Sequence, residues 1–134
     1  MSESYDNKQL IAFWVNHAEE DFLTMQAMVA AKRYSWSLFI GHLVIEKYLK
    51  ALYLKRNDRF PPNTHNLLRL AEEANIIISN DLRLFLVNVT AFNISGRYDD
   101  YKESFKKKCT PEFTLTWVEH ITAKKIWIKE LINQ

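Results

Sequence analysis

The chain has 134 residues, of which 48% are hydrophobic and 25% charged, and its formal net charge is +2. These values fit one globular domain over residues 1–134 and give no sign of a second domain. The near balance of charge means that composition alone does not indicate nucleic-acid binding. Only two glycines and three prolines interrupt the chain, which favours long helices.

Cysteine usage and hydropathy point to a cytoplasmic protein without a membrane span. Cys109 is the single cysteine, so no internal disulfide can form, and the first residues, MSESYDNKQ, are polar. The longest apolar runs are interrupted by Glu46, Lys47 and Lys50, well short of the roughly 20 residues that span a bilayer.

The first helix is expected from about Gln9 to Ala31, because its apolar residues recur at steps of three and four. A very short link at Tyr34 then leads into a central helix over Ser35–Arg56, so these two helices should be antiparallel neighbours. Apolar side chains cover most of the circumference of the central helix, which predicts packing on several sides.

The segment after the central helix, NDRFPPNT, contains two prolines and is the first loop. Thr64 or Asn66 can cap a short helix that runs to about Ala74. The three isoleucines Ile76–Ile78 have no β-like partner and are interpreted as a buried linker rather than a strand.

Ser79 stands where an N-cap belongs, and the helix behind it should run to about Ser95 and end at Gly96. Residues 96–109 are expected to form a charged connection that could hold a short helical turn. Thr110 followed by Pro111 predicts the start of a final helix that runs to about residue 132. The predicted fold is all-α: an up-and-down antiparallel bundle of four long helices plus one short helix.

One narrow polar stripe remains on the central helix, where His42, Glu46 and Lys50 follow at four-residue spacing and point the same way. We expect this stripe to be exposed and to belong to any working face. The alternative is a solvated seam that a Glu46–Lys50 pair stabilises. A metal site is not favoured, since it needs a third ligand from His65 or another histidine, and the prediction is no cofactor.

The cluster Gly96–Tyr101 is the most suggestive local motif, because an arginine beside a phenol suits binding of a phosphate or a base. The alternative is a structural turn in which Arg97 pairs with Asp99 or Asp100. Lys106–Lys108 can extend a positive surface towards RNA or can simply be solvated.

Nucleophilic catalysis finds little support in the sequence. Cys109 follows three lysines, which should lower the pKa of its thiol, but no histidine is near it in sequence. With two isolated glycines the chain has no glycine-rich phosphate loop, so phosphate recognition has to come from side chains or helix ends.

Four segments in order resemble the HEPN domain, a small helical family named for higher eukaryotes and prokaryotes nucleotide-binding. They are WVNHAEEDFLTMQAMV, HLVIEKYLKALYL, THNLLRLAEEANI and SGRYDDY, and together they cover most of residues 10–105. The resemblance implies a helical bundle that forms a homodimer and is often encoded beside a minimal nucleotidyltransferase in toxin-antitoxin pairs.

Catalytic HEPN members are metal-independent ribonucleases with an arginine, four to six residues and then a histidine. No histidine follows Arg97 at that distance, and Tyr101 or Lys102 stands there instead. Arg59 and His65 fit the spacing and are the weak catalytic candidates.

Three functional readings therefore remain open. The first is binding of a nucleotide or a minimal nucleotidyltransferase in a cleft whose residues are His42, Glu46, Lys50, His65, Arg97 and Tyr98. The second is a metal-independent RNase toxin of the HEPN type, which would make the chain an endoribonuclease. The third is a non-catalytic dimerisation scaffold.

Overall fold

The computed structural model describes residues 6–134, which form six α-helices and no strand, as expected for an all-α protein. The helices have these bounds: α1 Asn7–Ala30, α2 Tyr34–Asn57, α3 Leu67–Glu73, α4 Asn80–Arg97, α5 Asp99–Lys108 and α6 Pro111–Ile132. The predicted bounds of α1, α2, α3, α4 and α6 agree with these to within two residues.

Polar N-caps explain where four of the helices begin. The side chains of Asp6, Asn66, Ser79 and Thr110 each accept a hydrogen bond from a backbone N–H in the first turn of α1, α3, α4 and α6, respectively. Pro111 follows Thr110 as the first residue of α6, where its missing N–H leaves no hydrogen bond unmade. The predicted caps Ser79 and Thr110 are thus confirmed, and of the two candidates for α3 the cap is Asn66.

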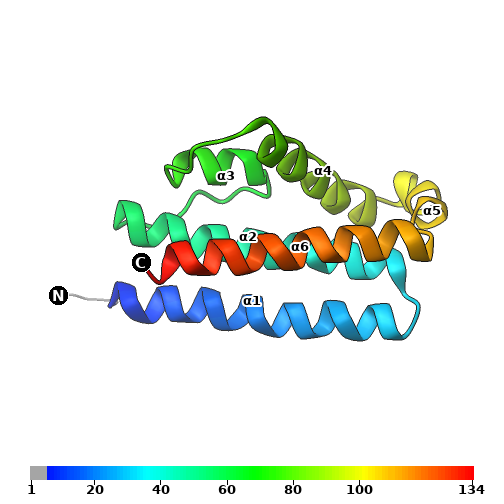
Figure 1. Cartoon of the computed structure of the whole chain (residues 1–134), viewed down its shortest axis with the longest axis horizontal. Coiled ribbons are helices and arrows are strands. Elements are labelled where there is room, and N and C mark those ends of the chain that lie inside the picture. The colour runs from blue at the N-terminus through cyan, green and yellow to red at the C-terminus, as the bar shows by residue number, and fades with distance from the viewer. Residues whose placement is uncertain (1–5) are drawn as a thin grey trace.

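Helix α2 is the centre of the molecule, and α1, α3, α4 and α6 pack around it (Figure 1). The four longest helices alternate in direction along the chain, with α1 and α4 running one way and α2 and α6 the other (Figure 1). This arrangement buries more of α2 than of any other helix, including Leu38, Ile45 and Leu52. The predicted packing of the central helix on several sides is confirmed.

Helices α1 and α6 both come close to α2 at Gly41. A Cβ atom at this position would lie 2.7 Å from Cδ1 of Ile121 and 3.1 Å from the sulfur of Met25. Because glycine has no Cβ, α1 and α6 can both approach α2 closely at this level.

Three details of the predicted fold are wrong. Residues 99–108 form helix α5 rather than a connection, so residues 6–134 contain six helices and not five. Helix α4 continues through Gly96 to Arg97 and ends at Tyr98, whose extended backbone begins the link to α5. The linker Ile76–Ile78 is buried only in part, since Ile76 and Ile78 pack against the core while the Ile77 side chain is 93% exposed.

Across residues 6–134, none of the helices has an apolar stretch of the length needed to cross a bilayer. The cytoplasmic location stays a prediction.

Candidate functional site

The polar stripe on α2 is buried, which corrects the prediction that it is exposed. Relative exposure is 0% for His42, 4% for Glu46 and 8% for Lys50. These three residues lie under the loop that precedes α3 and beside α4, where they bond to one another and to neighbouring residues. The alternative of a solvated seam is wrong for the same reason, but the Glu46–Lys50 pair that it predicts is present.

Glu46 is the hub of this network. Its Oε2 accepts a hydrogen bond from Lys50 Nζ at 3.0 Å, and its Oε1 accepts one from His65 Nδ1 at 2.7 Å. Burial raises the pKa of the Glu46 carboxyl, but the hydrogen bonds from His65 and Lys50 outweigh burial, so the pKa lies below its ordinary value. The carboxylate is therefore ionised and acts as an acceptor only.

His42 holds the loop from beneath. Its Nε2 lies 2.9 Å from the backbone oxygen of His65, so this nitrogen carries the proton and donates. Burial lowers the pKa of His42, although the bond to the His65 carbonyl and the charge of Glu46 act in the opposite direction. Nδ1 of the neutral ring then has a lone pair, which faces the amide Nδ2 of Asn93 on α4 at 3.4 Å.

His65 is the member of the network that reaches the surface. Its side chain is 46% exposed, and its Nδ1 is committed to Glu46. Because the carboxylate can only accept, Nδ1 carries a proton, and in the neutral form of the ring the lone pair is therefore on Nε2. A buried carboxylate that fixes the ring and tautomer of an imidazole is the arrangement that general bases use in proteins.

Arg97 and Tyr98 lie at the end of α4, and both are exposed. The Arg97 guanidinium lies 6.0 Å from the ring centre of Phe39, and its charge reaches His42, where it lowers the pKa of that ring. Among residues 6–134, Asp99 pairs with Lys102 and not with Arg97. The structural turn in which Arg97 pairs with Asp99 or Asp100 is thus absent, and the guanidinium is open to a ligand.

Arg59 and His65, which have the formal spacing of the ribonuclease motif, contact different parts of α2. Nε of Arg59 donates to the hydroxyl of Tyr53 at 3.2 Å, whereas His65 bonds to Glu46. Tyr53 follows Glu46 by seven residues in α2, which corresponds to about 10 Å along the helix axis. Within one chain these contacts hold the two candidates apart.

Cys109 is not an activated thiol. Its side chain is buried, and burial raises the pKa of the thiol to about 11, while the charge of Lys108 lowers it only in part. The prediction that three lysines lower this pKa is wrong, because desolvation is the larger effect.

No group of three histidine, cysteine or acidic side chains with the geometry of a metal site occurs in the part of the chain that the structure describes. The residue that sequence reasoning missed is Asn93, which is 4% exposed on the inward face of α4. Its signal was a polar residue at an apolar position of the helical repeat, on the face that Val89 and Phe92 share.

The comparison with protein families gives a match to the HEPN domain over residues 11–126. The matched segment includes the whole of the α2 network, His65 and Arg97, and it covers most of the chain. This protein belongs to the HEPN domain family. Searches of curated proteins and of solved structures gave no match.

Proposed function

We propose that this HEPN protein binds a minimal nucleotidyltransferase and its nucleotide through a surface formed by His65, Arg97 and Tyr98. The observation that carries the proposal is the Glu46–His65 hydrogen bond of 2.7 Å, which holds an imidazole at the surface with Nε2 free. His42 and Lys50 act beneath this surface as positioning residues and do not touch the ligand.

The chemistry of the three exposed side chains suits a phosphate-bearing ligand. A guanidinium offers paired charge-assisted donors that match phosphate oxygens, and a phenol offers a flat face for a base. An imidazole with one committed nitrogen can accept a proton or a hydrogen bond at the other. Arg97 and Tyr98 are adjacent in sequence. One turn earlier in α4, the Asn93 side chain contacts His42, and His42 in turn bonds to the backbone of His65.

The experiment is a binding titration of the purified chain with a minimal nucleotidyltransferase, with and without ATP. His65→Ala and Arg97→Ala should each weaken the complex about tenfold or more, since each removes a charged or hydrogen-bonding group. Arg59→Ala is the matched control, because this arginine is exposed but contacts Tyr53 instead. Equal affinity for all three variants and the native chain would contradict the proposal.

A second candidate function is metal-independent RNA cleavage, and the geometry of His65 is the observation that favours it. A carboxylate-oriented imidazole can take the proton of an RNA 2′-hydroxyl at Nε2. Cleavage of RNA that is lost in both His65→Ala and Arg59→Ala would establish this activity and assign the arginine–histidine pair to it. No cleavage by the native chain would exclude it.

The homodimer that HEPN membership implies has a candidate surface on α4. Leu84, Val87 and Ile94 lie on the outward face of this helix and are 61%, 51% and 46% exposed. With Ala91 they follow steps of three and four, the spacing of a helix–helix seam. In an antiparallel pair of α4 helices, this row of one copy packs against the same row of the other, as a two-fold axis requires.

In this proposal residues 1–134 form one HEPN domain of a cytoplasmic toxin-antitoxin pair. The pair consists of this chain and the nucleotidyltransferase. A growth assay tests this role by expressing each of the two proteins alone and both together. One of them alone should arrest growth, and expression of both should restore it.

A further inference from the structure

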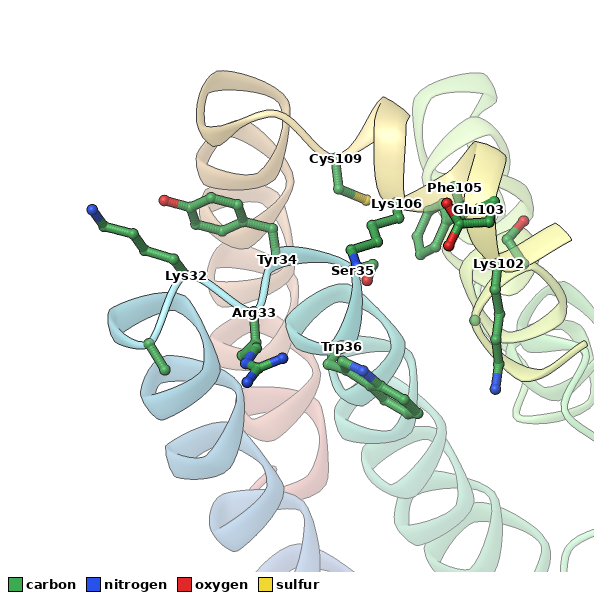
Figure 2. A pocket seen from close by; sticks show the side chains of 13 residues that line it. Lys32, Arg33, Tyr34, Ser35, Trp36, Lys102, Glu103, Phe105, Lys106 and Cys109 are labelled. Atoms are coloured by element: carbon green, nitrogen blue, oxygen red, sulfur yellow. The ribbon is translucent and has the colours of Figure 1, made fainter. Parts of the chain in front are cut away.

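A cavity of about 610 Å³ lies beside α5 and shares no lining residue with the surface described above. The link between α1 and α2, the first turn of α2, the last turn of α4 and helix α5 surround it (Figure 2). Its volume falls within the range of small-molecule sites, which run from about 300 to 1,000 Å³.

The lining is cationic. It contains Lys32, Arg33, Lys102 and Lys106, and one carboxylate, Glu103. Figure 2 shows that Lys106 extends from α5 towards Ser35 and that Lys32 points away from the cavity. Within residues 6–134 neither Arg33 nor Lys106 forms an ion pair, so their charges are free for a ligand.

An exposed indole stands between these cations. Trp36 is 47% exposed, and Figure 2 shows its side chain between those of Arg33 and Lys102. The ammonium of Lys102 lies 5.6 Å from the centre of the Trp36 ring. A flat aromatic face beside several cations can stack on a planar ring while the cations bind an anionic group attached to it.

The first turn of α2 adds donors to the same cavity. Its N-cap, Arg33, makes no side-chain capping bond, and the turn contains no acidic residue. Ser35 and Trp36 line the cavity, and their backbone N–H groups have no acceptor within the helix. The positive end of the α2 dipole therefore adds to the positive potential that Lys106 and Arg33 create at this cavity.

We infer that this cavity binds a phosphate monoester that carries a planar ring, such as a nucleoside monophosphate. The phosphate lies against Lys106, Arg33 and the first turn of α2, and the ring stacks on Trp36. This site is independent of the function proposed above, because none of its residues belongs to the His65 surface.

The test is an NMR titration of the full chain with AMP, followed at the indole N–H resonance of Trp36, which a Trp36→Phe variant assigns. AMP should shift this resonance in a saturable manner. Lys106→Glu should weaken the affinity about tenfold or more, since it replaces a charge-assisted contact by repulsion. Lys107→Glu changes the net charge equally but lies outside the lining, so it should leave the affinity within about twofold.

Two further probes separate the phosphate from the ring. Adenosine should bind far more weakly than AMP, and inorganic phosphate should displace AMP only at higher concentration than AMP itself requires. An unchanged Trp36 resonance, equal effects of Lys106→Glu and Lys107→Glu, or adenosine binding as tightly as AMP would overturn the inference. Loss of the Trp36 shift in His65→Ala would also overturn it, whereas weaker nucleotidyltransferase binding in that variant concerns the other surface.

Discussion

The buried ion pair between Glu46 and Lys50 determines how substitutions at these two positions change the stability of the protein. Both side chains are buried, with 6% and 10% exposure, and Lys50 Nζ also lies 5.4 Å from the ring centre of Trp14. Removal of one partner leaves the other charged and without its counterion in the interior. Replacement of both by apolar residues removes the whole desolvation cost.

Glu46→Leu should therefore lower the free energy of unfolding by about 3 kcal/mol, the usual cost of an unpaired buried charge. The double variant Glu46→Leu, Lys50→Met should recover most of this loss. Urea unfolding followed by circular dichroism measures both. If the double variant is no more stable than Glu46→Leu alone, the unpaired charge of Lys50 is not the cause of the lost stability.

The free energy of unfolding should decrease in two stages as the pH is lowered. Burial lowers the pKa of His42 below its ordinary 6.5, so below pH 6.5 the unfolded chain binds a proton that the folded chain does not. Stability from this group is complete above pH 6.5 and is lost as the pH falls towards the folded pKa. The lowered pKa of Glu46 adds a second loss below its ordinary 4.5.

Urea unfolding at intervals from pH 8 down to about pH 3 measures the two stages. A His42→Asn variant should lack the loss that begins near pH 6.5 and retain the one below pH 4.5. If this variant shows the same decline as the native chain from pH 6.5, another group is responsible.

The sequence predicts which residues of α2 belong to the site, but it does not predict that they are buried. Spacing of four placed His42, Glu46 and Lys50 on one face of α2, and the structure brings them together. Their burial was not predictable, because it depends on the loop at His65 and on Asn93 of α4, which lie 23 and 51 residues away from His42. Such long-range contacts leave no trace in the periodicity of one helix.

At the scale of elements, α4 approaches α2 closely near the site, at Gly96. A Cβ atom on Gly96 would lie 2.9 Å from Cδ1 and 3.0 Å from Cβ of Phe39. Phe39 is also the ring beneath the Arg97 guanidinium. The last turn of α4 thus depends on a glycine to bring Arg97 over α2.

Gly96→Ala should destabilise the protein by about 1 kcal/mol, because overpacking outweighs the gain in helix propensity. Phe39→Leu in the same chain should relieve the clash, so the two effects should not add. Thermal unfolding of the two single variants and the double variant gives the coupling. A Gly96→Ala protein more stable than the native one would mean that Phe39 moves without cost.

Helix α5 shows why one element was missed. Its residues are mostly charged, and Phe105 is the only buried one among them, so apolar periodicity could not reveal the helix. A different signal was present: Asp99 and Asp100 in its first turn and Lys106–Lys108 in its last turn complement the helix dipole. The other helices were predictable because capping residues and long apolar repeats mark them.

At the scale of the whole molecule, the exposed apolar row on α4 leads to a prediction about assembly. Val87→Glu combined with Ile94→Glu should convert the expected dimer into a monomer, since it places charges in an apolar seam. Leu23→Glu is the matched control, because Leu23 is 65% exposed on α1, away from this row. Light scattering after size-exclusion chromatography gives the mass of each.

A native chain that elutes as a monomer, or a Leu23→Glu variant that dissociates to the same extent, would contradict the α4 interface. Dimer formation by the native chain and the control alone would support it.

The orientation of His65 by a buried carboxylate is common to both proposed functions, and ring NMR of ¹⁵N-histidine-labelled protein tests it directly. The neutral ring of His65 should carry its proton on Nδ1, and Glu46→Gln, which can also donate, should release this preference. A native His65 ring with its proton on Nε2, or a tautomer that is the same in Glu46→Gln, would contradict the account.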